Sequence, residues 1–105
     1  MIVMKFGGTS VGSSGRIRNT CSTIKSNIKR KPIVVVSAVT KMTDTLIRLA
    51  KECMSGTHQD TLKQIEDAHN KILDELGINR SLLNNDFKSL RQLSGETAKN
   101  RNDDD

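Results

Sequence analysis

The sequence predicts an α/β fold that begins with a strand–helix–strand unit and continues as a helical hairpin. Two short apolar runs, residues 2–6 and 33–36, have the composition of buried parallel strands. Apolar side chains recur at helical spacing between these runs, and again from residue 43 to residue 98. A strand–helix–strand start of this kind places both strands parallel in one sheet.

The first strand is expected at residues 2–6, where a short apolar run is ended by two glycines. The helix after it has an apolar stripe with spacings of four, three and four residues, formed by Ile17, Cys21, Ile24 and Ile28. Ser13 or Ser14 can cap its N-terminus. Pro32 ends it, because proline disfavours helix in the residue before it.

Residues 33–36 are β-branched and uncharged, which predicts a central strand in a right-handed βαβ unit. A second loop, residues 37–42, follows this strand. Thr43 is a suitable N-cap for the next helix, and Asp44 is favourably placed in its first turn. We expect this helix to stop at Gly56 and to direct inward the side chains of Leu46, Ala50 and Cys53.

Two further helices are expected in the second half of the chain. Residues 60–76 carry an apolar stripe that includes His69 as a core or interface residue, and Gly77 is placed to end that helix. Ser81 can cap the last helix, whose apolar positions are Leu83, Phe87 and Leu90. Two strands cannot form a stable open sheet when both of its faces need covering, so we expect residues beyond this chain, or another chain, to complete the sheet.

The composition is that of one small domain or of a piece of a larger one. Apolar residues make up 34% of the chain, with two Phe and no Trp or Tyr, so the core must be aliphatic. The net charge is +5, but the 17 basic residues are interpreted as scattered among the 12 acidic ones, with only residues 29–31 clustered. Since no aromatic platform is available for stacking bases, we expect no nucleic-acid partner.

The cysteines and the apolar runs predict the compartment. Cys21 and Cys53 form no metal or redox motif, and each lies on an apolar helix stripe, which predicts buried thiols in a reducing environment. No signal peptide precedes the first strand, and no apolar run approaches the roughly 18–20 residues of a membrane span. We therefore expect a cytoplasmic chain without membrane contact.

The stretch Lys5-Phe6-Gly7-Gly8-Thr9-Ser10 stands at the end of the first strand. It is neither a Walker loop nor a dinucleotide fingerprint, because the GxxxxGK[ST] and GxGxxG spacings are both absent. Lys5 can project its ammonium group over the carboxyl edge of the sheet, and the glycines let backbone N–H groups approach phosphate oxygens. For this stretch alone, a tight turn beside a strand-end cation is the alternative.

The second loop makes a ligand site the better interpretation. Ser37-Ala38 leaves the neighbouring strand at the same sheet edge, and Thr43 opens the next helix. Two parallel strands thus present small hydroxyl residues and a helix N-terminus to one crevice, which suits a carboxylate or phosphate group. Thr43 can cap its helix and contact a ligand at the same time.

Two motifs carry a resemblance to a known family. Val3-Met4-Lys5-Phe6-Gly7-Gly8-Thr9-Ser10-Val11 resembles the N-terminal signature of aspartate kinases, which belong to the amino-acid kinase superfamily. Val34-Val35-Val36-Ser37-Ala38 and Thr43-Asp44-Thr45-Leu46 resemble the second strand of that family and its S-A-x(4)-T-[ND]-x-L loop. The resemblance implies the start of a three-layer αβα, carbamate kinase-like sheet, incomplete here.

The resemblance also implies an activity, namely transfer of the γ-phosphoryl group of MgATP to the side-chain carboxylate of L-aspartate. The product would be 4-phospho-L-aspartate, at the entry to lysine, threonine and methionine synthesis. Lys5 would be catalytic, and ATP would be bound by Lys5, Phe6, Gly7, Gly8, Thr9 and Ser10. Aspartate would be bound by Ser37, Ala38 and Thr43. Mg²⁺ would arrive with ATP, no protein metal ligand is expected, and the whole enzyme would be a homo-oligomer.

Other parts of the family pattern are missing. We find no S-x-G-E-x-x-S segment, no G-R-G-G-S-D loop and no regulatory domain of the ACT type; Ser94-Gly95-Glu96 is one residue short of the first spacing and is interpreted as a linker. Residues 1–105 would be the N-terminal part of a kinase domain, comprising a βαβα substrate and phosphate-loop unit at 2–56, a helical insertion at 57–98 and a polar tail at 99–105. The run Asp103–Asp105 is interpreted as a solvated terminus rather than a magnesium site.

We expect the chain alone to be inactive, because it would hold half of the substrate site and little of the nucleotide site. Two other interpretations stay open. The chain could belong to another amino-acid kinase of the same fold, or it could be a non-catalytic fragment that pairs with a full-length kinase subunit through its helical hairpin.

Overall fold

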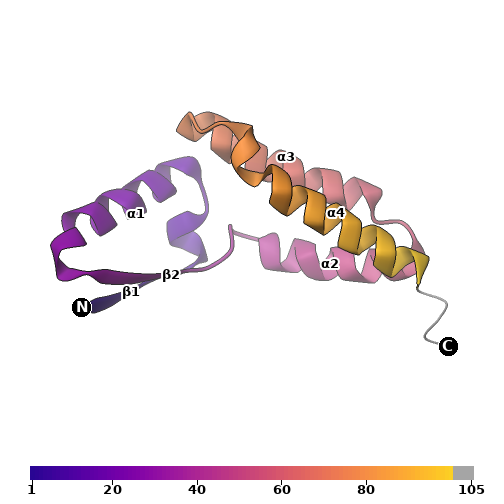
Figure 1. Cartoon of the computed structure of the whole chain (residues 1–105), viewed down its shortest axis with the longest axis horizontal. Coiled ribbons are helices and arrows are strands. Elements are labelled where there is room, and N and C mark those ends of the chain that lie inside the picture. The colour runs from indigo at the N-terminus through magenta and orange to yellow at the C-terminus, as the bar shows by residue number, and fades with distance from the viewer. Residues whose placement is uncertain (101–105) are drawn as a thin grey trace. The chain divides into compact units, whose positions relative to one another are not determined.

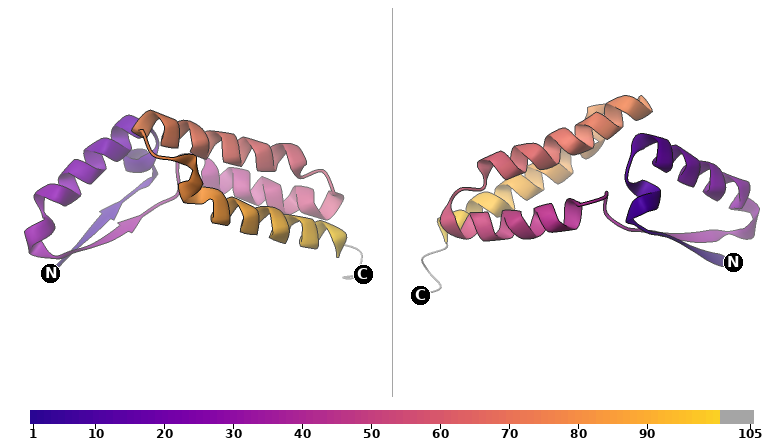
Figure 2. Two further views of the ribbon diagram at one scale, coloured as in Figure 1. Left: turned by 45° about the horizontal axis from the view of Figure 1, so that its top comes forward. Right: turned by 180° about the vertical axis from the view of Figure 1, so that it is seen from behind.

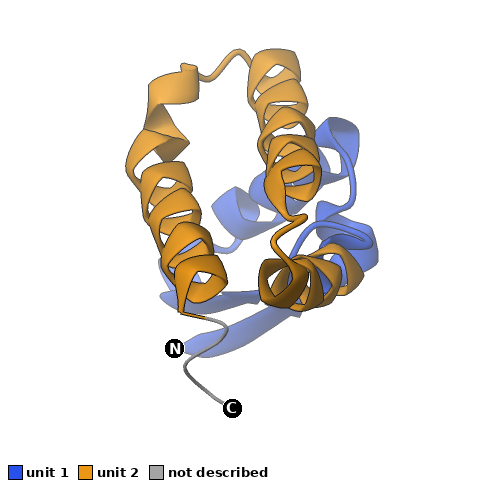
Figure 3. Ribbon diagram, turned by 90° about the vertical axis from the view of Figure 1, so that its right-hand side faces the viewer, with its two compact units in different colours: residues 1–43 blue, residues 44–105 orange. Residues whose placement is uncertain are grey.

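A computed structural model describes residues 1–100, which form two compact units. The first unit comprises residues 1–43 and the second begins at residue 44 (Figure 3). The predicted tail lies mostly outside the described residues, as does the run Asp103–Asp105. The predicted division after residue 56 stays a prediction. No helix among the described residues is long and apolar enough to cross a membrane.

The first unit is the predicted βαβ unit. Strand β1 (Ile2–Phe6) pairs in parallel with β2 (Pro32–Val36), and helix α1 (Ser14–Ser26) connects them (Figures 1 and 2). The side chain of Ser13 caps α1 by accepting a hydrogen bond from the backbone N–H of Arg16 across 3.3 Å. The chain leaves α1 through the 3₁₀ turn η2 (Ile28–Arg30), and β2 then begins at Pro32. The α/β fold class is confirmed.

The sheet is covered on one side only within this unit. Along β1, Ile2, Met4 and Phe6 are half-buried, whereas Val3 and Lys5 are exposed. The apolar residues Ile33 to Val36 of β2 are all 39–58% exposed. Within residues 1–100 the sheet has only these two strands, so the central position predicted for β2 is not found there. This exposure fits the expectation that other residues complete the sheet, which stays a prediction.

The second unit contains the predicted helical hairpin. Helix α2 (Met42–Ser55) enters this unit from the first, and α3 (Gln59–Leu76) and α4 (Asn84–Lys99) follow it, with the 3₁₀ turn η3 (Arg80–Leu83) between the last two. Gly56 and Gly77 end α2 and α3 with positive φ angles of 74° and 71°, which glycine adopts without steric cost. Both helix ends were predicted from these glycines.

The core of the second unit is aliphatic apart from one aromatic contact. Its buried apolar side chains are Leu49, Cys53, Leu62, Ile65, Leu73, Phe87 and Ala98. The His69 ring meets the Phe87 ring edge-on at 6.0 Å, and its Nδ1 lies 2.7 Å from the carbonyl oxygen of Ile65. His69 is therefore a packing residue of the α3–α4 pair, as predicted.

Several local predictions are wrong. In α2, Leu46 and Ala50 are exposed, whereas Leu49 is buried together with Cys53. Thr43 is not an N-cap, because α2 already begins at Met42. Ser81 lies in η3, where Asn79 accepts a hydrogen bond from its backbone N–H, and α4 begins only at Asn84. Cys21 is exposed, since the neighbouring Thr20 occupies the buried face of α1.

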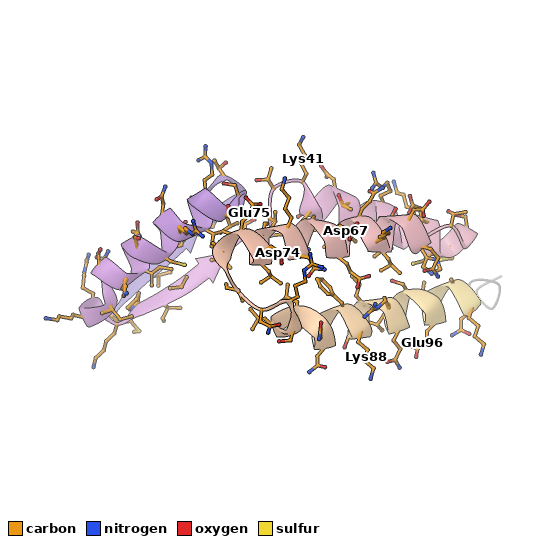
Figure 4. The ribbon with its side chains drawn as sticks, turned by 90° about the horizontal axis from the view of Figure 1, so that it is seen from above. Lys41, Asp67, Asp74, Glu75, Lys88 and Glu96 are labelled. Carbon is orange, nitrogen blue, oxygen red and sulfur yellow. The ribbon has the colours of Figure 1, made fainter. Side chains whose placement is uncertain are left out.

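The last of these errors concerns Ser94–Glu96, which lies inside α4 rather than in a linker. Figure 4 shows the side chain of Glu96 extending from this helix. The residue belongs to the second unit, and Gln92 donates a hydrogen bond to its carboxylate across 3.2 Å.

Candidate functional site

The candidate site lies where both strands of the first unit end. In the parallel register Lys5 pairs with Val35 and Phe6 pairs with Val36, so the two chains leave the sheet at the same edge. After β1 the chain continues through Gly7 into the 3₁₀ turn η1 (Gly8–Val11). After β2 it continues through residues 37–41 into α2. The loop of residues 7–12 and the loop of residues 37–41 are called here the first and second loop.

Direct contacts join the two loops. The backbone N–H of Ser37 donates to the carbonyl oxygen of Phe6 across 3.0 Å. The hydroxyl group of Thr40 donates to the carbonyl oxygen of Gly8, also across 3.0 Å. A Cβ built on Gly8 would lie 3.7 Å from the carbonyl oxygen of Ala38 and 3.8 Å from the Ser37 hydroxyl. The structure thus brings Gly8 together with Ser37 and Ala38, as the sequence predicts.

Thr40 and Gly12 are site residues that the sequence does not reveal. A Cβ built on Gly12 would collide with the Thr40 hydroxyl and would lie 3.2 Å from the carbonyl oxygen of Gly8. Glycine is needed here because the second loop approaches closely and not because of a positive φ angle, since Gly12 has a φ of −77°. Thr40 falls among the variable positions of the second motif, so no pattern marks it.

A further hydrogen bond holds the first loop on α1. The hydroxyl of Thr20 donates to the carbonyl oxygen of Ser10 across 2.8 Å, and Thr20 is only 7% exposed. Val11, at the end of η1, is buried as well. Thr20 and Cys21 both lie one helical turn from Ile17 and Ile24 in the sequence, so their spacing alone does not tell which of the two is buried.

The remaining predicted residues are exposed or half-buried. The Lys5 side chain is exposed and has no hydrogen-bond or ion-pair partner within residues 1–100. Gly7 and Thr9 are exposed, and Ser10 is half-buried. Thr43 is exposed in the first turn of α2, and no hydrogen bond joins its side chain to either loop. The structure therefore shows the contact of the two loops directly. Its only support for Thr43 as a site residue is the position of Thr43 just after the second loop.

The charge of the first unit fits anionic groups and disfavours a protein-held metal ion. Residues 1–43 contain eight Lys and Arg and no Asp or Glu. Mg²⁺ prefers carboxylate oxygens, and this unit has none to offer. Among residues 1–100 no group of three or more His, Cys, Asp or Glu side chains is placed to hold a metal ion.

The arrangement can bind phosphate or carboxylate groups. Lys5, which has no partner among the described residues, stands at the strand end, and the adjoining backbone has no Cβ at two successive positions, Gly7 and Gly8. No side chain caps η1, so its first N–H groups are not occupied by one. The hydroxyl of Ser37 lies close to Gly8, 3.8 Å from the position that a Cβ on this glycine would take. Sites of this kind neutralise anionic oxygens with one mobile cation and fixed backbone donors.

Comparison with known proteins agrees with this geometry. The amino acid kinase family matches residues 1–99. The chain belongs to the amino acid kinase family. The resemblance of the two motifs to this family is thereby confirmed, and with it the α/β fold that the motifs imply.

Three similar proteins are aspartokinases. Aspartokinase 3, chloroplastic, of Arabidopsis thaliana is 34% identical over 96 residues, which cover 87% of this chain and 17% of that protein. The aspartokinase of Chlamydia trachomatis is 41% identical over 81 residues, which cover 77% and 18%. The aspartokinase of Geobacillus stearothermophilus is 46% identical over 54 residues, which cover 50% and 13%. The chain thus spans less than a fifth of the length of these relatives.

Proposed function

We propose that this chain contributes the phosphate-loop side of an aspartate kinase active site. The reaction is transfer of the γ-phosphoryl group of ATP to the side-chain carboxylate of L-aspartate, which gives 4-phospho-L-aspartate and ADP. The observation that carries the proposal is the close approach of Ser37 and Ala38 to Gly8, near enough that an added Cβ would touch both, at the edge where Lys5 stands. The names of the similar proteins support the choice of aspartate among the possible acceptors.

The residues of the first loop would bind the transferring phosphate. A carboxylate oxygen of aspartate attacks the γ-phosphorus, and the bond from that phosphorus to the β–γ bridging oxygen breaks. Lys5 would offset negative charge on the phosphate oxygens, and the loop would be lined by Gly7, Gly8, Thr9 and Ser10. Such a transfer depends mainly on positioning and charge stabilisation, which a strand-borne lysine and fixed N–H groups can supply.

The second loop would position the acceptor. Ser37 and Ala38 would lie beside the reacting groups, since they already contact Gly8. Thr43 would contact aspartate from the first turn of α2, where helix N–H groups favour a carboxylate. The proposal includes a role at the start of lysine, threonine and methionine synthesis, a cytoplasmic location and a homo-oligomeric whole enzyme. Mg²⁺ would enter with ATP.

Ligand binding to the 105-residue chain tests the proposal. We expect ATP and L-aspartate each to shift the backbone amide NMR signals of Gly7, Gly8 and Ser37. Lys5→Met should weaken ATP binding at least about fivefold, because a charge-assisted contact to phosphate is lost. The matched control is Lys25→Met, which removes the same charge from the exposed last turn of α1 and should change ATP binding less than about twofold.

Equal losses of ATP binding in Lys5→Met and Lys25→Met would overturn the proposed site. Amide NMR shifts with L-glutamate but not with L-aspartate would indicate another amino-acid kinase. We expect the chain alone to give no ATP- and aspartate-dependent hydroxamate. Turnover in that assay would contradict the prediction of inactivity.

A further inference from the structure

A second polar site lies in the first unit, beside α1. A hollow of about 200 Å³ opens there, and it is lined by Phe6, Ser10, Arg16, Asn19, Thr20 and Thr23. All of these residues come from the end of β1, from η1 or from α1. The lining includes one cation and four other polar side chains, which is unlike an apolar packing defect.

Three of the lining side chains have hydrogen-bond donors to spare. The hydroxyl hydrogen of Thr20 is used by the carbonyl oxygen of Ser10, and that of Thr23 by the carbonyl oxygen of Asn19 across 3.1 Å. By contrast, the guanidinium of Arg16, the side-chain amide of Asn19 and the hydroxyl of Ser10 donate to no partner within residues 1–100. The hollow therefore offers three side chains whose hydrogen-bond donors are available to a bound ligand.

The hollow and the candidate site use opposite faces of β1. Lys5 and Phe6 are consecutive in the strand, so their side chains point to opposite faces of the sheet. Phe6 lines the hollow together with α1, whereas Lys5 is exposed on the face that α1 does not cover. A ligand in the hollow is thus separate from a phosphate held by Lys5.

The charge distribution favours an anion in the hollow. The interpretation that the basic residues are scattered among the acidic ones is wrong. The first unit holds eight basic residues and no acidic residue, and all twelve acidic residues follow it. No carboxylate in this unit can therefore neutralise Arg16 or compete with an anionic ligand for it. A unit of one charge sign raises the local concentration of small anions of the other sign.

We propose that this hollow binds a phosphate group, either as inorganic phosphate or as the terminal group of a phosphate monoester. A planar guanidinium donates two parallel hydrogen bonds to phosphate, and Asn19 and Ser10 supply donors to the remaining oxygens. Phosphate carries more charge than a carboxylate, so the field of the unit favours it further. The inference goes beyond the proposed kinase activity and does not rest on it.

The ligand would also act on the first loop. Ser10 belongs to η1, its backbone N–H donates to the carbonyl oxygen of Gly7 across 3.0 Å, and its own carbonyl accepts from Thr20. A phosphate held by the Ser10 hydroxyl would restrain the same turn that the candidate site uses. A phosphate bound in the hollow would thereby order the first loop from the face of β1 that α1 covers, opposite to Lys5.

Titration of the 105-residue chain with inorganic phosphate, at constant ionic strength set with NaCl, tests this inference by amide NMR. We expect saturable shifts at Ser10, Arg16 and Asn19. Arg16→Gln should weaken binding at least about fivefold, and Arg16→Lys, which keeps the charge but not the planar fork, should recover part of the loss. The control Lys25→Gln removes one charge from the same helix, away from the hollow, and should change binding less than about twofold.

Equal weakening by Arg16→Gln and Lys25→Gln would overturn the proposal, because it would show attraction by the whole unit without a site. Acetate binding as tightly as phosphate would overturn the choice of ligand. A parallel titration with glycerol 3-phosphate identifies the source: tighter binding than inorganic phosphate assigns the hollow to phosphate monoesters, and equal or weaker binding assigns it to inorganic phosphate. Circular dichroism of each variant confirms that α1 is intact.

Discussion

The hydroxyl group of Thr40 donates a hydrogen bond to the carbonyl oxygen of Gly8 across 3.0 Å, although the two residues are 32 positions apart in the sequence. This bond joins the loop that follows β1 to the loop that follows β2. Together with the hydrogen bond from the Ser37 N–H to the Phe6 carbonyl, it holds the two chain segments together at the sheet edge where the candidate site lies. The geometry of that site therefore depends on a side chain at a variable position of the second motif.

Removing the Thr40 hydroxyl should loosen this connection. Thr40→Val keeps the shape of the side chain but leaves the Gly8 carbonyl without its donor, so we expect a loss of about 0.5–1.5 kcal/mol in the free energy of unfolding. Thr40→Ser keeps the hydroxyl and should lose clearly less. Urea unfolding followed by circular dichroism measures both values. If the valine and serine variants are equally stable, the hydrogen bond does not contribute.

Gly12 should not tolerate even a methyl group. In Gly12→Ala the new Cβ would collide with the Thr40 hydroxyl and crowd the Gly8 carbonyl, so we expect destabilisation by about 1–3 kcal/mol. Gly15→Ala is the matched control. Gly15 lies in α1, and a Cβ added there would meet nothing within 4 Å, so alanine should stabilise the chain at this position by about 0.5–1 kcal/mol.

A double variant locates the collision. Because Thr40→Ala removes the hydroxyl and leaves room, Gly12→Ala should cost less in a Thr40→Ala background than in the natural chain. Additive losses in the double variant, measured by urea unfolding, would mean that the two residues do not touch.

Thr20 should stabilise the chain more than its helical neighbour Thr23. Thr20→Val removes the donor to the Ser10 carbonyl at a site that is 7% exposed, and we expect a loss of about 1–2 kcal/mol. Thr23 donates only to its own helix from an exposed position, so Thr23→Val should stay within about 0.5 kcal/mol of the natural chain. Similar losses at the two positions in thermal unfolding would contradict an anchoring role for Thr20.

The sequence predicts the elements of this fold better than it predicts their contacts. The strands and most of α1 follow from local spacing, although α1 ends at Ser26 and not beside Pro32. The ends of α2 and α3 follow from single glycines. The contact of Gly8 with Ser37 and Ala38 could also be predicted, because parallel strands bring their carboxyl ends to one edge. In each case local spacing, a single residue or the general geometry of parallel strands determines the result.

The wrong predictions concern features that depend on a shift of one residue along a helix or on a contact between residues far apart in the sequence. One position along a helix turns a side chain by about 100°, so the buried face of α1 takes Thr20 and leaves Cys21 exposed. Likewise, α2 begins one residue before Thr43, and this removes the predicted cap. The bonds of Thr40 and Thr20 join residues 32 and 10 positions apart, and no periodicity of the sequence encodes them.

The pKa of Asp74 should depend on Arg80. Arg80 donates two hydrogen bonds to the Asp74 carboxylate, at 3.0 and 2.7 Å, and this pairing lowers the pKa of Asp74 below its ordinary value of 3.8 (Asp74 is labelled in Figure 4). A carboxyl group whose pKa is lower in the folded state adds stability above its unfolded pKa, and this stability is lost as the pH falls through the folded value. Arg80→Gln should therefore raise the pKa of Asp74 towards 3.8.

Carboxyl ¹³C NMR titration measures that pKa directly, and urea unfolding measures its consequence for stability. The natural chain should be more stable than Arg80→Gln at pH 6, and the difference should shrink as the pH falls below 3.8. Arg91→Gln is the control, because Arg91 pairs with Glu66 at 3.2 Å and should leave the pKa of Asp74 unchanged. A stability difference that persists unchanged at pH 2 would show that Arg80 acts through packing instead of through its charge on Asp74.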